Sequence, residues 1–378
     1  MRVLLSTYGS RGDVEPMVAL AVQLQALGAE VRMCAPPDEE FTELLARECV
    51  SPVPFDRPWR SWHRPPTAAE RQQRVADFIA AQYGTVTEAA SGCDVIVATA
   101  MSQFVAPSVA ERSGVAYRCV LFCPDVLDGL DGQSLDDVFS APINTHRASM
   151  GLPPVRNVGE LVFTAQPFLA ADPTLGPWRG PGGFDVRQTG AWILPDERPL
   201  PTDLLTFLAA GEPPVYLGFG SMRTLRPDGA RAAVEAIRAQ DRRVLVNRGW
   251  AGLTPVGDQD DCLVIGEANH QQLFGRVAAV VHHGGAGTTT AAARAGAPQV
   301  VVPQGGDQFY WARRVAELGI GAAHDGPVPT VQSLSVALGT ALTTETRARA
   351  TAMAGEIGTD GARDAAELLL AEAATERP

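Results

Sequence analysis

The stretch that most constrains the fold lies between residues 277 and 308, where two apolar segments each end in glycines and lead into a helix. Residues 277–281 form an apolar run typical of a buried parallel strand, and His282, His283 and several glycines separate it from a helical segment of threonines and alanines. A second apolar run, 299–302, ends in PQGGDQ before another helical segment. Strand, glycine turn and helix in this order predict a parallel α/β sheet.

The glycine turn at 284–287 indicates a site for an anion. Glycines between a strand and a helix let backbone N–H groups approach a ligand, and the helix N-terminus favours negative charge. A phosphate or diphosphate fits this position, although many such turns use glycine only to fit the fold. His283 could be a core histidine, but its place directly before a glycine-rich helix start favours contact with the phosphate. Because ligands of open α/β sheets bind at the carboxyl ends of the strands, the polar residues after the second strand should lie beside the same site.

Length and composition indicate a globular protein of two domains. The chain has 378 residues, 46% hydrophobic and 20% charged, and no run reaches the ~20 apolar residues of a membrane span. A strand begins at Arg2, which leaves no room for a signal peptide, so a cytoplasmic location is expected. The net charge is −12 and all 31 basic residues are arginine. This balance disfavours a nucleic-acid partner, and the six cysteines, without CxxC spacing, are expected to be buried free thiols.

Strands and helices alternate through both halves of the chain. Residues 125–160, with several aspartates, glycines and prolines, predict a loop with short helices. Prolines and glycines are dense between 172 and 214, where a domain boundary is expected. The apolar pattern predicts strands at 2–6, 30–35, 49–55, 95–98, 116–122, 184–193, 215–219, 243–247 and 262–265, and helices at 14–27, 68–90, 104–112, 228–240 and 362–374.

Two further groups of residues are candidates for function. Asp13 lies where the first strand meets the first helix; it can satisfy N–H groups of the helix's first turn or face a ligand at the carboxyl edge of the sheet. In the segment 56–66, Arg57, Trp59 and Trp62 stand among prolines. Such a loop can contact a ligand or remain an ordinary surface loop. Both alternatives stay open for each group.

Four short motifs resemble those of the nucleotide-sugar glycosyltransferases with the two-Rossmann, or GT-B, fold: GSRGD at 9–13, GFGS at 218–221, HHGGAGTT at 282–289 and GGDQ at 305–308. The pattern is closest to the branch that glycosylates antibiotics of the vancomycin group. The resemblance implies two α/β Rossmann-like domains facing across a central cleft. Residues 1–200 would bind the acceptor and 201–361 the nucleotide sugar, and the helix in 362–378 would cross back to the first domain.

The resemblance also implies a role for each matching residue. Asp13 stands where many members have a histidine general base, and Ser10 is its active-site neighbour. The segment 56–66 is the candidate acceptor loop, through Arg57, Trp59 and Trp62. No cofactor is implied, because the nucleotide sugar is a co-substrate. The donor-binding residues implied by the motifs are Arg11, Ser221, His283, Gly285, Gly287, Thr288, Asp307 and Gln308.

The function expected from this resemblance is inverting transfer of a sugar, such as a deoxysugar, from a dTDP- or UDP-sugar to a hydroxyl of a natural-product aglycone, with a glycopeptide antibiotic as the leading acceptor. A sterol, macrolide or lipid acceptor is the alternative within the fold, and a nucleotide-sugar epimerase is the alternative reaction. Residues 258–261, DQDD, contain a DxD pattern that binds metal in other glycosyltransferase folds. An exposed loop is the favoured interpretation here, so activity without a metal is expected.

Overall fold

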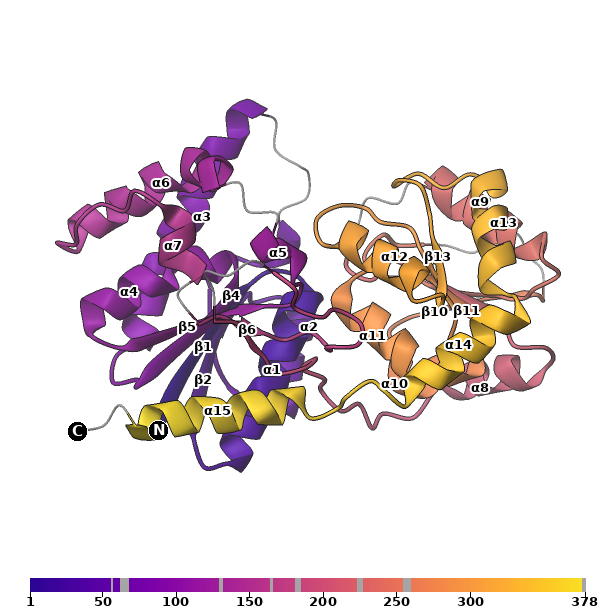
Figure 1. Cartoon of the computed structure of the whole chain (residues 1–378), viewed down its shortest axis with the longest axis horizontal. Helices are drawn as coiled ribbons and strands as arrows, with labels where there is room; N and C mark the ends of the chain where they lie inside the picture. The colour runs from indigo at the N-terminus through magenta and orange to yellow at the C-terminus, as the bar shows by residue number, and fades with distance from the viewer. Residues whose placement is uncertain are drawn as a thin grey trace. The chain divides into compact units, whose positions relative to one another are not determined.

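The computed structural model describes residues 1–55, 57–61, 68–128, 132–163, 166–180, 185–222, 227–253 and 260–375. The chain divides into two compact α/β units (Figure 1). We call Met1–Ala171, Trp178–Leu194 and Thr359–Pro378 the N-terminal unit, and Asp172–Pro177 with Pro195–Gly358 the C-terminal unit.

The N-terminal unit is built on a seven-stranded parallel sheet with the strand order β3-β2-β1-β4-β5-β6-β7. The central strand β1 is buried from its second residue to its end, because helices cover both faces of the sheet. The strands are β1 (Arg2–Tyr8), β2 (Glu30–Ala35), β3 (Ser51–Pro54), β4 (Val95–Ala100), β5 (Ala116–Leu121), β6 (Phe168–Leu169) and β7 (Arg187–Gln188).

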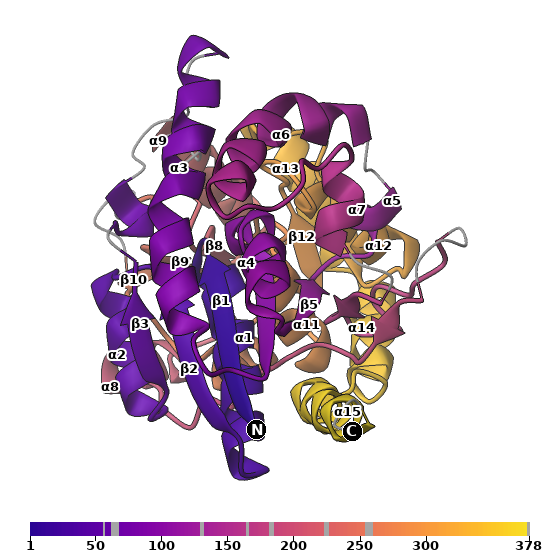
Figure 2. The same ribbon diagram turned by 90° about the vertical axis from the view of Figure 1, so that its left-hand side faces the viewer.

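Figure 2 looks onto this unit, with β3, β2 and β1 side by side and two helices, α3 and α4, in front of them. The C-terminal helix α15 belongs to the N-terminal unit, where it packs against α1. The helical segments of the unit are α1 (Arg11–Ala26), α2 (Glu39–Arg47), η1 (Trp59–Ser61), α3 (Ala68–Ala89), η2 (Met101–Phe104), α4 (Ala106–Ser113), α5 (Asp125–Asp128), α6 (Gly132–Ser149), α7 (Val158–Phe163) and α15 (Gly361–Thr375).

The C-terminal unit has a six-stranded parallel sheet with the order β10-β9-β8-β11-β12-β13. The strands are β8 (Val215–Gly218), β9 (Val244–Asn247), β10 (Cys262–Ile265), β11 (Ala279–His282), β12 (Gln299–Val301) and β13 (Gly321–Ala323). The helical segments are α8 (Thr202–Ala209), α9 (Pro227–Arg238), α10 (His270–Leu273), η3 (Phe274–Arg276), α11 (Ala286–Arg294), α12 (Gln308–Glu317), α13 (Val331–Ala341) and α14 (Thr344–Ala354).

Two apolar layers hold this second sheet, one on each face, because side chains alternate along a strand. Val215 and Leu217 of β8 enter a cluster with α9 and α13. Tyr216, between them, enters the opposite cluster with α8, α10 and α11. With both faces covered, the polar ends of the strands are the positions left for a ligand.

The prediction of a loop with short helices for residues 125–160 is wrong in its central part. Residues Gly132–Ser149 form the long helix α6, which contains Pro142. Proline usually ends a helix, which is why the sequence pattern concealed this one. Asp136 of this segment accepts a hydrogen bond from the N–H of Val158 at 2.7 Å and so joins α6 to α7.

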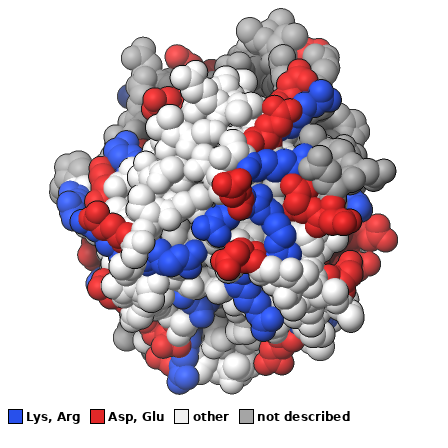
Figure 3. Space-filling model, turned by 90° about the vertical axis from the view of Figure 1, so that its right-hand side faces the viewer, with Lys and Arg blue, Asp and Glu red and all other residues white. Residues whose placement is uncertain are grey.

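The predicted strand at 184–193 is also much shorter in the structure, at Arg187–Gln188. The six cysteines are free thiols, as expected, although Cys49 is exposed. On the face of the molecule in Figure 3, arginines and carboxylates interleave instead of gathering into a basic patch. None of the helices among the described residues is long and apolar enough to cross a membrane.

Candidate functional site

Except for Arg11, which lies in the N-terminal unit, the structure brings the residues expected to bind the donor to one edge of the C-terminal sheet. The strands β8, β11 and β12 are neighbours and run parallel, so their carboxyl ends lie side by side. The loop after β8 carries Ser221, and the turn after β11 carries His283 and the glycines that begin α11. The loop after β12 carries Asp307 and Gln308.

One glycine of this edge, Gly284, is required by close contacts. Gly284 has a φ of +90°, and a Cβ there would lie 2.6 Å from Cγ1 of Val301 and 3.1 Å from the carbonyl oxygen of Gln308. Gly285 is the N-cap of α11, and Gly287 and Thr288 lie in the first turn of the helix. The turn therefore packs directly on the start of α12 and presents the N-terminus of α11 at the strand ends.

His283 lies between two of these loops. A Cβ on Gly220 would be 3.3 Å from Cε1 of the imidazole ring, and a Cβ on Gly285 would be 2.5 Å from its Nε2. Burial lowers the pKa of His283 to about 4, so the ring is neutral near pH 7. Its Nδ1 is buried and has no hydrogen-bond partner among the described residues. Such a group in a native protein calls for a ligand or water.

The GGDQ motif is partly engaged in holding its own turn. Gln308 is only 8% exposed; its Oε1 accepts from the N–H of Gln304 at 2.8 Å and its Nε2 lies 3.6 Å from Sδ of Met222. Asp307 Oδ2 accepts from Nε1 of Trp311 at 3.2 Å. Burial raises the pKa of Asp307, which the hydrogen bond from Trp311 partly offsets. A hydrogen bond from a sugar hydroxyl would favour the charged carboxylate.

Asp13, Ser10 and Arg11 lie together in the N-terminal unit, at the start of α1. Asp13 Oδ2 accepts from the backbone N–H of Ser10 at 2.7 Å and from its hydroxyl at 3.1 Å. Arg11 donates to Glu15, one helical turn on, at 2.6 Å. A Cβ on Gly9 would lie 2.2 Å from Oδ2 of Asp13, so only glycine allows the carboxylate this position. Asp13 thus has the helix-capping role, which leaves its predicted role as a base open.

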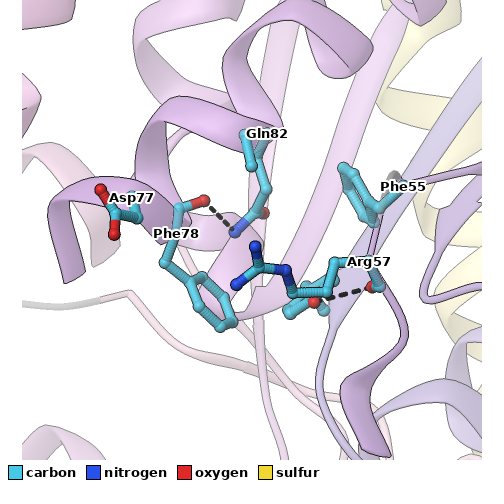
Figure 4. A pocket seen from close by; sticks show the side chains of 7 residues that line it. Phe55, Arg57, Asp77, Phe78 and Gln82 are labelled. Atoms are coloured by element: carbon cyan, nitrogen blue, oxygen red, sulfur yellow. Dashed lines mark hydrogen bonds between the residues drawn. The ribbon is translucent and has the colours of Figure 1, made fainter. Parts of the chain in front are cut away.

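A pocket of about 130 Å³ lies beside the carboxyl end of β1 in the same unit (Figure 4). The ring of Tyr8 meets the rings of Phe55, Trp59 and Phe78 edge to face, with centroid separations of 5.3, 5.6 and 4.5 Å. The Arg57 side chain points into the pocket, and the hydroxyl of Tyr8 donates to the Arg57 carbonyl at 2.8 Å. Its lining residues are Tyr8, Phe55, Arg57, Asp77, Phe78, Ala81 and Gln82.

No sequence pattern pointed to Asp38, the residue that holds this segment. Asp38 is 4% exposed, and its two carboxylate oxygens accept from the backbone N–H groups of Trp59 at 2.6 Å and Arg60 at 2.9 Å. Its position 21 residues before Trp59 hides the contact from any local pattern. Trp62, the third aromatic or cationic residue predicted to bind the acceptor, lies outside the described residues.

The DQDD segment offers little to a metal in the described part of the chain. Asp258 lies outside it, and Asp261 forms a two-pronged ion pair with Arg238, at 2.8 and 2.7 Å. Within the ranges that the structure covers, no group of three or more His, Cys, Asp or Glu side chains is arranged to hold an ion. Asp261 therefore has a structural partner at the end of α9.

Comparison with solved structures defines the class of fold. The glycosyltransferase of kitacinnamycin aligns with a TM-score of 0.78 at 18% identity, covering 98% of both chains. The glycosyltransferase VinC, solved with dTDP, aligns with a TM-score of 0.69 at 23% identity over 99% of this chain and all of VinC. The two parallel sheets are those of the GT-B glycosyltransferases, as the sequence predicted.

Comparison of sequences then places the chain in a family. Residues 3–127 match the glycosyltransferase family 28 N-terminal domain, and residues 263–365 match the C-terminal domain of the erythromycin biosynthesis protein CIII-like family. The vancomycin aglycone glucosyltransferase of Amycolatopsis orientalis is 50% identical over 407 residues, which cover 100% of this chain and 99% of that protein. The dTDP-epi-vancosaminyltransferase of the same organism is 48% identical, with the same coverage. The chain belongs to this glycosyltransferase family.

Proposed function

We propose that this protein transfers a sugar from a dTDP- or UDP-sugar to a hydroxyl of a glycopeptide aglycone, with inversion at the anomeric carbon. The single observation that carries the donor side is the buried Nδ1 of His283 beside the N-terminus of α11, which has no hydrogen-bond partner in the described part of the chain. A neutral imidazole has one N–H to donate, and a diphosphate oxygen is an acceptor. The helix N-terminus adds favourable electrostatics for the same group.

The reaction forms a bond between the acceptor oxygen and the anomeric carbon and breaks the bond from that carbon to the diphosphate. Asp13 takes the proton of the acceptor hydroxyl, with Ser10 as its neighbour, and Arg11 is assigned to the departing diphosphate. His283, Ser221, Gly285, Gly287 and Thr288 stabilise the charge of the departing nucleoside diphosphate. Asp307 and Gln308 orient the sugar.

The glycopeptide acceptor is favoured over a sterol, macrolide or lipid by the relatives. Identity is 50% to the vancomycin aglycone glucosyltransferase but 31% to the O-mycaminosyltylonolide 6-deoxyallosyltransferase of Streptomyces fradiae. The aromatic pocket around Tyr8 supports an acceptor that carries aromatic rings, since ring edges and a guanidinium suit such groups. We assign Arg57 and Trp59 to binding of the acceptor, together with Trp62 of the same acceptor loop.

The donor side is tested by titrating the protein with dTDP and UDP in a calorimeter. His283→Ala should weaken binding by about 1–3 kcal/mol, because it removes a hydrogen bond to a charged group. Asp307→Asn is the matched control. Asp307 lies at the same sheet edge but is assigned to the sugar, so this variant should bind dTDP with wild-type affinity. If the wild type and both variants bind dTDP with equal affinity, His283 does not bind the diphosphate.

The acceptor side is tested by mass spectrometry of reactions that contain a dTDP-sugar and a glycopeptide aglycone. A product heavier by one sugar, together with free dTDP, is expected. An epimerised donor with no acceptor product would instead support the epimerase. Arg57→Ala should raise the acceptor KM without changing the donor KM. Arg60→Ala is its control, because Arg60 is on the same segment but pairs with Glu40 at 3.0 Å.

A further inference from the structure

The first histidine of the HHGG motif has both ring nitrogens engaged inside the C-terminal unit. His282 ends β11 and is 0% exposed. Its Nδ1 lies 3.1 Å from the backbone nitrogen of Gly284, and its Nε2 lies 2.9 Å from Oε1 of Gln299. Gln299 begins β12, is also 0% exposed, and donates from Nε2 to the carbonyl of Thr289 at 3.3 Å. The chain of contacts joins the glycine turn, two neighbouring strands and α11.

These hydrogen bonds determine where the proton of the ring lies. A backbone N–H can only donate, so Nδ1 of His282 accepts from Gly284 and carries no proton. The proton of the neutral ring is then on Nε2, which donates to Oε1 of Gln299. Burial lowers the pKa of His282 to about 3, and the neighbouring His283 acts in the same direction. The ring therefore stays neutral near pH 7.

The group that His282 holds is central to the donor turn. Gly284 lies between His283 and Gly285, and its left-handed backbone places it against Val301 of β12. Contact with β12 limits the turn on one side, and the hydrogen bond to His282 orients the Gly284 peptide on the other. A rotation of this peptide would move both the His283 ring and the N-terminus of α11. His282 itself is enclosed by protein and has no surface to offer a ligand.

We propose that His282, supported by Gln299, is a positioning residue that fixes the backbone of residues 283–285 for the nucleoside diphosphate without contacting it. The inference rests on the proposed donor site. A histidine at position 282 is thus required for its two ring nitrogens, because Nδ1 acts as an acceptor and Nε2 as a donor. Hydrophobic volume alone does not replace it.

Two substitutions test the roles of the two ring nitrogens of His282 separately. In His282→Asn, Oδ1 is as many bonds from Cα as Nδ1 of histidine, so it can still accept from Gly284. In His282→Gln, the terminal amide has the reach of Nε2, so contact with Gln299 remains but the acceptor for Gly284 is lost. We expect His282→Gln to bind dTDP about tenfold more weakly than the wild type, the effect of one lost buried hydrogen bond, and His282→Asn to lose clearly less.

A control variant separates positioning from general loss of stability. His324 is another buried histidine of the same unit, 5% exposed, with Nδ1 2.8 Å from the Gly326 carbonyl and Nε2 2.7 Å from the Ser333 hydroxyl. His324→Gln should lower the melting temperature as His282→Gln does, but should keep the wild-type affinity for dTDP. In steady-state kinetics, His282→Gln should raise the donor KM and leave the acceptor KM unchanged.

Equal dTDP affinity of the two His282 variants, at whatever level, would overturn the proposal. A wild-type protein that binds neither dTDP nor UDP would refute the proposed function instead, so the two failures are distinguishable. If the variants do not fold, ¹⁵N NMR of wild-type protein gives the tautomer directly. We expect a proton on Nε2 and none on Nδ1 at pH 7, and the opposite tautomer would exclude acceptance from Gly284.

Discussion

Replacing Asp13 by asparagine separates its two candidate roles, helix cap and general base. The carboxylate caps α1 by accepting from the N–H and the hydroxyl of Ser10, at 2.7 and 3.1 Å. Asparagine has nearly the same shape, and its Oδ1 can accept from the Ser10 N–H. The variant therefore keeps the capping hydrogen bond without the negative charge, but it can no longer take a proton from the acceptor.

The two roles differ in magnitude enough to be told apart. Loss of the charge at the first turn of α1 should cost about 0.3–1 kcal/mol of folding free energy, the usual contribution of an acidic group there. Loss of a general base should lower kcat by about 10²-fold or more, which corresponds to at least about 2.7 kcal/mol in the activation free energy. A catalytic effect therefore exceeds anything that capping explains.

The assay compares Asp13→Asn with Asp13→Ala, which removes cap and base together. Initial rates are measured at saturating dTDP-sugar and aglycone, stability by urea unfolding and donor binding by calorimetry with dTDP. We expect the two variants to lose activity equally, alanine to be the less stable, and dTDP affinity to be unchanged in both. An asparagine variant with a kcat within about fivefold of wild type would show that Asp13 is a cap and that another group deprotonates the acceptor.

Three more outcomes follow from the structure. Gly9→Ala should lower kcat although it adds only a methyl group, because its Cβ would lie 2.2 Å from Oδ2 of Asp13; wild-type turnover would contradict this placement. Activity should survive EDTA, since helix N-termini and side chains are assigned to the diphosphate, and loss restored by magnesium or manganese would show otherwise. The pKa of His282 is about 3 in the folded protein and ~6.5 in the unfolded chain. Below about pH 6.5 the unfolded chain therefore binds a proton at His282 that the folded protein does not bind. The free energy of unfolding should therefore drop by about 2 kcal/mol from this residue between pH 7 and 5, and a smaller drop is expected in His282→Asn.

The parts of the fold that the sequence predicts are those with a local cause. The run from 277 to 302 alternates apolar strands with glycine turns, and the structure has β11, α11 and β12 there. Their adjacency follows from the rule that consecutive parallel strands tend to pair. The helix α6 was missed for a local reason as well. Pro142 lies within it, and a proline usually marks the end of a helix.

The site was predictable in its motifs but not in the partners of each side chain. Nothing in GGDQ shows that Gln308 is turned inward to the N–H of Gln304, because this depends on how the loop after β12 closes. The adjacent histidines of HHGG look equivalent in the sequence. In the structure His282 is the last residue of β11 and is enclosed between β11 and β12. His283 follows the strand and lies between two glycine turns.

The segment Asp172–Pro177 could not have been assigned from the sequence at all. It follows β6 of the N-terminal unit, yet it belongs to the C-terminal unit, where Arg314 of α12 donates to the carbonyl of Leu175 at 2.9 Å. A Cβ on Gly176 would lie 2.8 Å from the ring of Trp311, so the segment packs closely on α12, the helix that follows Asp307. These contacts join residues about 140 positions apart, beyond the range of any periodicity. A single cut near residue 200 would separate α12 from this support, so exchanging donor domains between relatives requires residues 172–177 to travel with the C-terminal unit.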